Sequence, residues 1–211
     1  MTSPIRDLFH AGLLISQSPT DQLRLQVEIE TGAVSCPLKQ SLLAALERLT
    51  VTDLGVTPAF FASGVITFVT IHNSQEFWLG FFCMPAGTFF PLHDHPRMIG
   101  CSRLLTGRIL YRALNVVGRT EDGGYTAEVG AEYELVGCGT EMLTGNVRNV
   151  HEIAAVDDSV LLDFFVPYYD PTRECKYFRA TEQREGLVLL REMSQPNIPC
   201  RVKTYRGLPI H

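Results

Sequence analysis

The sequence has little that would suit a membrane or a nucleic acid. Its longest apolar runs, such as residues 77–84, fall far short of the roughly 20 residues that a membrane-spanning helix needs. Basic residues number 18 against 23 acidic ones, which gives a net charge of -5 and a pI near 5.7. Nucleic-acid-binding proteins normally carry a basic patch, so we expect neither a nucleic-acid partner nor a membrane.

Signals for export and for disulfide bonds are also missing. The first seven residues lack the charged region and the long apolar core of a secretory signal. The six cysteines contain no C-x-x-C pair, so a thiolate zinc site is not indicated. We therefore expect free thiols in a reducing compartment, the cytoplasm or the nucleus, with Cys83, Cys101 and Cys138 filling the core.

Length and composition indicate a globular chain with one main domain. The chain has 211 residues, of which 45% are apolar and 19% charged, so it can bury a sizeable core. No repeat of fixed period and no low-complexity tract interrupts it. No additional interaction segment stands out, so we expect a monomer.

The hydrophobic pattern changes near residue 62. Before it, apolar residues at three-and-four spacing predict two helices, over residues 20–30 and 37–49. After it, short runs rich in Val, Ile, Phe, Tyr and Thr predict strands separated by turns. The predicted strands cover residues 65–72, 77–84, 108–117, 127–135, 150–155 and 160–166. Such strands without intervening helices predict an antiparallel sandwich or barrel. We divide the chain into a helical segment, 1–62, packed on a barrel with a C-terminal extension, 63–211.

Three of the six histidines suggest a metal site. In an extended chain, residues i and i+2 face the same way, so His93 and His95 can point at one ion while Asp94 turns away. Paired imidazoles suit iron, nickel, copper, zinc or manganese. Two histidines exposed in a turn would give the same short motif. His151, taken alone, could equally be a hydrogen-bonded core histidine, which is the more common role of an isolated histidine.

The surrounding residues match the first motif of the cupin barrel, G-x5-H-x-H-x4-E-x6-G. Gly87, His93, His95 and Gly107 stand at the required spacing, but Gly100 occupies the position of the usual glutamate. His151, at the start of a predicted strand, stands where the second cupin motif supplies its histidine. The motifs imply a cupin double-stranded β-helix, a jelly-roll barrel in the all-β class, preceded by N-terminal helices.

A site of three histidines without a carboxylate has a chemical consequence. Neutral imidazoles leave the full charge of a divalent ion uncompensated, so the open positions favour anionic donors such as a thiolate. Soft, reducing donors together with dioxygen favour iron(II).

A longer stretch resembles a family of thiol dioxygenases, the plant cysteine oxidases and 2-aminoethanethiol (cysteamine) dioxygenase. The resemblance rests on residues 77–87, on the PLHDHPRM run at 91–98 and on the SRLLTG run at 102–107. A second block resembles the family in NVH at 149–151, LD at 162–163, PYY at 167–169 and CKYF at 175–178. Residues 51–56 are similar to the linker before the family's barrel.

This resemblance implies a function and a set of site residues. His93, His95 and His151 would bind Fe(2+), and the enzyme would add both atoms of O2 to the sulfur of an N-terminal cysteine, creating an N-degron and sensing oxygen. Cysteamine is the alternative thiol substrate. Asp163 and Tyr169 would act in the pocket, Asp163 near the substrate amine.

Three further residues either match a feature of the family or depart from its pattern. Cys175 and Tyr177 match a pair that can form a thioether crosslink, with plain packing as the default. Arg97 stands where the family usually has glycine, and its long cation would narrow the pocket entrance or attract a carboxylate.

Two other functions fit the barrel: an isomerase or decarboxylase using manganese, zinc or nickel, and a non-catalytic binding module. Residues 182–211 lie beyond the quoted motifs.

Overall fold

The computed structural model describes residues 3–33, 35–184 and 186–210. Three helices come first: α1 (Pro4–Gln17), α2 (Pro19–Thr31) and α3 (Pro37–Arg48), followed by the short 3-10 helix η1 (Pro58–Phe60). Twelve strands then follow within these residues. They are β1 (Ile66–Asn73), β2 (Trp78–Met84), β3 (Phe89–His93), β4 (Ile99–Thr106), β5 (Arg108–Arg119), β6 (Tyr125–Val136), β7 (Thr140–Leu143), β8 (Val150–Ala155), β9 (Ser159–Val166), β10 (Tyr177–Arg184), β11 (Leu187–Met193) and β12 (Cys200–Val202).

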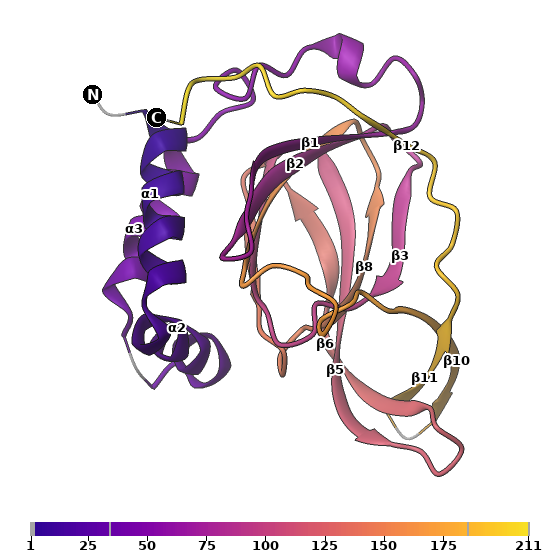
Figure 1. Cartoon of the computed structure of the whole chain (residues 1–211). Helices are drawn as coiled ribbons and strands as arrows, with labels where there is room; N and C mark the ends of the chain where they lie inside the picture. The colour runs from indigo at the N-terminus through magenta and orange to yellow at the C-terminus, as the bar shows by residue number, and fades with distance from the viewer. Residues whose placement is uncertain (1–2, 34, 185, 211) are drawn as a thin grey trace.

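The strands form two sheets that curve around a common interior (Figure 1). One sheet has the order β12-β1-β2-β9-β4-β7, and the other closes in the order β10-β11-β6-β5-β8-β3. All pairs are antiparallel except β1 with β12. The long β5–β6 hairpin runs beyond the barrel and pairs there with β11. This architecture confirms the predicted all-β cupin barrel with N-terminal helices.

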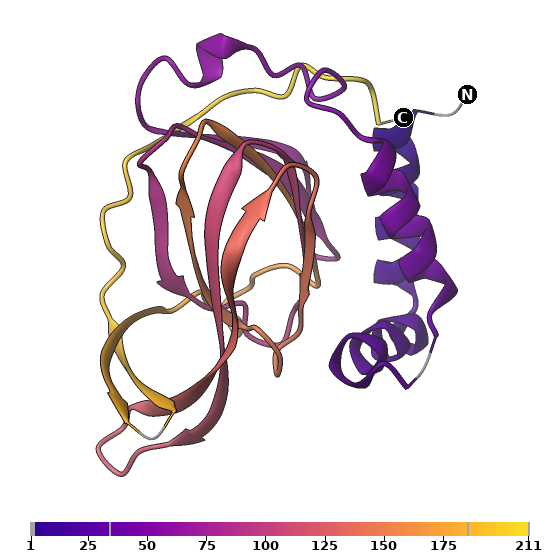
Figure 2. The same cartoon turned by 180° about the vertical axis from the view of Figure 1, so that it is seen from behind.

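The helices cover the outer face of the β2–β9–β4 sheet (Figure 2). Apolar side chains from α1 and α3 share one core cluster with Phe81, Leu162 and Phe164 from that sheet. A second cluster, which includes Leu104, Tyr111 and Ile153, fills the space between the two sheets. The division at residue 62 stays a prediction, since core residues from both sides of it pack in the same cluster.

The helical segment has one more helix than the sequence analysis expected. The two predicted helices correspond to α2 and α3, whereas α1 was missed. Its sequence carried the signal: Pro4 occupies the first turn, and Ile5, Leu8, Phe9 and Ile15 form a buried stripe at helical spacing. No described helix is both long and apolar enough to cross a bilayer.

The six predicted strands form, each within about two residues of its expected bounds, but six others were missed. Two of these, β11 and β12, come from the tail beyond the quoted motifs, and β10 starts within the CKYF motif and runs into that tail. All six cysteines are free, as expected. Cys83 and Cys101 are buried, but Cys138 is exposed, so its expected place in the core was wrong. It stands in a short turn between β6 and β7, where it has little to pack against.

Candidate metal centre

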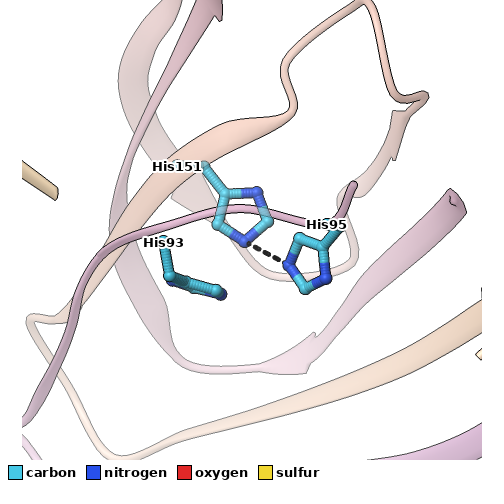
Figure 3. Close-up of side chains that lie close together, drawn as sticks. All are labelled: His93, His95 and His151. Carbon is cyan, nitrogen blue, oxygen red and sulfur yellow. Dashed lines mark hydrogen bonds between the residues drawn. The ribbon is translucent and has the colours of Figure 1, made fainter. Parts of the chain in front are cut away.

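The fold brings His93, His95 and His151 together inside the barrel (Figure 3). His93 ends β3 and pairs with His151 on β8 in the sheet register, so the two lie side by side. His95 follows two residues after β3. One nitrogen of each ring lies within 4.8 Å of the other two, and the Nε2 atoms of His95 and His151 are 3.3 Å apart. Three donors at this spacing can hold one metal ion.

Hydrogen bonds hold two of the rings with Nε2 toward the common point. His93 Nδ1 lies 2.8 Å from the carbonyl oxygen of Pro91, to which it donates when that nitrogen is protonated. The Tyr169 hydroxyl lies 2.6 Å from His95 Nδ1 and donates to the Asp94 carbonyl oxygen at 2.9 Å. A hydroxyl that donates to a carbonyl can accept from the imidazole N–H. Metal-binding histidines commonly have such a partner on the second nitrogen.

Burial keeps the three rings uncharged. Desolvation lowers the pKa of His93 and moves the pKa of His95 and His151 well below the ordinary value. For His95, the neighbouring rings of His151 and His93 add to the effect. A neutral imidazole offers a lone pair, so the site is ready to accept a cation near neutral pH.

Asn149 joins the two segments that carry the histidines. Its side-chain oxygen accepts a hydrogen bond of 2.8 Å from the backbone N–H of His95. The same loop is held from outside by Glu30 on α2, which accepts from Thr144 at 2.6 Å and from Asn146 at 3.0 Å. Sequence analysis quoted Asn149 only as part of a motif and did not single out Glu30, because no local pattern links residues so far apart.

Gly100 shows why a fourth, carboxylate ligand is absent. A Cβ atom at this position would lie 2.6 Å from Cε1 of Phe165 and 2.9 Å from Cγ of Leu143. The Phe165 ring in turn stacks on His95, with ring centroids 4.2 Å apart and planes 13° apart. An aromatic ring therefore fills the volume that a glutamate side chain would need.

The histidines lie at one wall of a cavity of about 230 Å³. Most of the lining is aromatic or aliphatic. Besides the three histidines it comprises Phe68, Trp78, Phe82, Phe90, Ile153, Leu161, Asp163, Phe165, Tyr168, Tyr169, Cys175 and Tyr177. Sequence reasoning assigned a role to only four of these twelve. Seven of the others belong to strands whose inward faces follow from the register, and Tyr168 follows β9.

Asp163 is the acidic residue among these lining residues. It is 7% exposed, and its Oδ1 atom has no hydrogen-bond partner among the described residues. Burial raises the pKa of this carboxyl to about 7, although a hydrogen bond from Ser102 opposes the shift. A buried carboxyl with an unused oxygen beside a metal site can receive a substrate cation or a proton.

Tyr169, Cys175 and Tyr177 form one group at the cavity wall. Burial raises the pKa of the Cys175 thiol, whereas hydrogen bonding with the two tyrosine hydroxyls opposes this shift.

Arg97, the remaining predicted site residue, lies outside the cavity. It is exposed, does not line the cavity and donates through its guanidinium to the backbone oxygen of Thr172. Its suggested role at the pocket entrance stays a prediction.

The fold and the three-histidine centre define a cupin barrel with the donors for one metal ion. The chain belongs to the PCO_ADO family, whose sequence model matches residues 47–208. This match includes most of the tail that the quoted motifs left out.

Curated relatives carry the two names that the motifs suggested. The 2-aminoethanethiol dioxygenase of Mus musculus is 29% identical over 142 residues, covering 56% of this chain and 55% of the relative. Plant cysteine oxidase 2 of Arabidopsis thaliana is 27% identical over 185 residues, covering 74% of this chain and 67% of the relative. The chain spans about half the length of the mouse relative.

Solved structures that resemble the chain are more distant. One is an uncharacterized conserved protein with a double-stranded beta-helix domain from Klebsiella pneumoniae, with a TM-score of 0.41 and 13% identity over 61% of this chain and 94% of that one. Our assignment of the fold rests on the strand order and register described above.

Proposed function

We propose that the chain is a non-haem iron(II) thiol dioxygenase that oxidises an N-terminal cysteine of a peptide or protein to its sulfinate. The observation that carries the proposal is the convergence of three imidazoles, two buried and one half-buried, on one wall of a cavity, with no carboxylate in this donor group among the described residues. Membership of the PCO_ADO family and the names of the curated relatives support it.

The donor set fits ferrous iron. His93, His95 and His151 offer three neutral nitrogen donors, and imidazole is a ligand that iron accepts. No carboxylate neutralises part of the cation's charge, so the remaining positions favour an anionic thiolate. Ferrous iron, when bound here, would supply the redox chemistry that joins a thiol to dioxygen.

The protein's own residues would position the substrate and exclude water. The aromatic walls keep the reacting sulfur in a largely dry space, where charge interactions are stronger than in water. The Asp163 carboxylate would pair with the ammonium group of an N-terminal cysteine. This positive ammonium group would favour the ionised form of Asp163, whose pKa burial raises in the free protein. Tyr169 would hold His95 in place through its Nδ1 atom.

The reaction needs only the thiol and dioxygen. A thiol R–SH and one O2 contain all the atoms of the sulfinic acid R–SO2H, so no further co-reactant is required. A cavity of about 230 Å³ suits a group the size of one cysteine, so further residues of a peptide would lie outside it. Cysteamine offers the same thiol and ammonium and is the second candidate, because relatives with both names match the chain.

Three further attributes belong to the same proposal. Oxidation of an N-terminal cysteine would create an N-degron and make protein turnover depend on oxygen. This role requires a reducing compartment, the cytoplasm or nucleus, which is consistent with six free cysteines. A monomer suffices, because all three histidines come from one chain.

The cysteine–tyrosine pair offers a separate test. We propose that Cys175 and Tyr177 can join as a thioether, with dioxygen as the oxidant that removes two hydrogens. Their hydrogen-bonding contact supports this pairing. Intact-mass measurement after turnover would detect the loss of two hydrogens, and Tyr177→Phe should abolish it. An unchanged mass after many turnovers would contradict the proposal.

Oxygen-consumption assays test the main proposal. Iron-loaded protein is given a peptide that begins with cysteine, cysteamine, or a peptide that begins with serine as the control. We expect one O2 consumed per sulfinate formed, with a mass gain of two oxygen atoms on the thiol substrate. Oxidation of neither thiol, with iron bound and the protein folded, would refute it.

A further inference from the structure

A second cavity lies between the helices and the outer face of the β4–β7 edge of the sheet. It has a volume of about 470 Å³ and is separate from the metal site, which faces the interior of the barrel. Its lining comes from α2, α3, β4, β7 and the loop before β8. The lining residues are Glu28, Ile29, Lys39, Leu43, Glu47, Arg103, Thr140, Met142, Val147 and Arg148.

Arg103 is the unusual residue of this cavity. Its neighbours at i-2 and i+2, Cys101 and Leu105, belong to the core under the helices, so Arg103 faces the same way. It is only 8% exposed. Its Nη1 donates to the Thr140 hydroxyl at 2.8 Å, but its buried Nε has no partner among the described residues.

Among the described residues, no carboxylate lies within ion-pair distance of Arg103. The two other cations at the cavity each have their own partner: Lys39 pairs with Glu28 at 2.9 Å, and Arg148 pairs with Glu141 at 2.5 Å. A buried guanidinium without an anion is unfavourable, since the low-dielectric surroundings do not replace its lost hydration. The cavity beside it leaves space for an anion from outside the chain.

The remaining lining indicates the chemical class of that anion. Glu28 and the exposed Glu47 also line the cavity, but Glu28 is paired with Lys39, so Arg103 is the lining cation without an ion-pair partner among the described residues. Its planar guanidinium fork matches carboxylate and phosphate oxygens. The apolar part of the lining is formed by Ile29, Leu43, Met142 and Val147. We propose that this cavity binds a small organic anion, with its carboxylate or phosphate group on Arg103 and a short apolar body against these side chains.

Binding would link three parts of the chain. Lys39 comes from α3, Arg103 from β4 and Arg148 from the loop that leads to His151. An anion held by them would stabilise the helices on the barrel, because a ligand that binds only the folded state raises its stability.

The test is calorimetric titration of the full chain, with and without bound iron, using inorganic phosphate, acetate and butyrate at constant ionic strength. The key variant is Arg103→Met, which keeps the length and removes the charge. Arg179→Met, at an exposed position on β10, is the matched control. Arg103→Lys keeps the charge without the fork and provides a second folded variant.

We expect saturable binding, with butyrate tighter than acetate if the ligand's body is apolar, and equal affinity with and without iron. Arg103→Met should weaken binding about ten- to a hundredfold, the range for a lost charged hydrogen bond. The affinity of Arg103→Lys for the anions should lie between those of the wild type and Arg103→Met, and the affinity of Arg179→Met should equal that of the wild type. Binding unaffected by both Arg103 variants, or no saturable binding of any of the three anions, would overturn the proposal. Because none of these readouts needs catalysis, their failure is distinct from a failure of the proposed function.

Discussion

Replacement of Gly100 tests whether packing, and not chance, keeps the metal site free of a carboxylate. In Gly100→Ala the new methyl group would lie 2.6 Å from Phe165 Cε1 and 2.9 Å from Leu143 Cγ, closer than carbon atoms normally approach. Phe165 is 4% exposed and stacks on His95, so its ring has little room to move away. Overpacking of this kind typically destabilises a core by about 1–3 kcal/mol.

That range sets the size of the expected effect. For a chain of this length, 1 kcal/mol corresponds to a Tm change of roughly 2–4 °C, so Gly100→Ala should lower the Tm by about 2–12 °C. Displacement of Phe165 should also disturb His95 and weaken ferrous-ion binding. Gly100→Glu should be worse on both counts, because it adds a buried charge without room to reach the metal.

Thermal unfolding and iron titration of four proteins would measure this: wild type, Gly100→Ala, Phe165→Leu and the double variant. If the methyl group and the ring compete for one volume, the double variant should lose less stability than the two single changes summed. A Gly100→Ala protein with unchanged Tm and iron affinity would refute the packing argument. A Gly100→Glu protein that binds iron more tightly than the wild type would refute it more directly.

Three further changes address the groups around the site. Tyr169→Phe removes the hydroxyl at His95 Nδ1 and should weaken iron binding about 10- to 100-fold, measured by competition with a chelator; unchanged affinity would contradict the positioning role. Asn149→Ala leaves the backbone N–H of His95 without its acceptor and should lower unfolding stability by about 1–3 kcal/mol in denaturant titrations, whereas a neutral effect would show that the bond contributes nothing. For Asp163, burial raises the pKa from 3.8 to about 7, so the folded state holds a proton that the unfolded state has lost, and metal-free protein should lose stability as pH rises from about 4 to 7. Asp163→Asn should flatten this part of the profile of Tm against pH, and a profile equal to the wild type would exclude the carboxyl as its source.

The sequence allowed the strands and the His93–His95 pair to be predicted because each of these signals was local. The β-rich runs predicted strands such as β8 and β9, and His93-x-His95 needed only the two-residue period of an extended chain. Joining His151 to this pair was not a local inference. It relied on the cupin motif, and the structure supplies the physical reason, a sheet register that sets His93 against His151.

What the sequence could not provide depends on contacts between distant segments. The inward strand faces that form the cavity wall follow from pairing, and the turn before β9 left the direction of Asp163 undetermined. Glu30 acts on the loop before His151 through a helix more than a hundred residues away. Arg103 reads as an ordinary charged residue within a strand until the helices are seen to cover it.

The two faces of strand β4 therefore present the same electrostatic problem, a positive charge without a carboxylate partner. Within the barrel, β4 has Gly100 at the position where the cupin motif has a glutamate. A metal ion bound there would receive no charge from this position and would favour an anionic substrate. On the outer face, Arg103 buries a cation with no carboxylate of its own. Since a buried charge without a partner is unfavourable, the two proposals share one physical basis: an anion from outside the chain would balance each cation, a thiolate at the metal and a small organic anion beneath the helices.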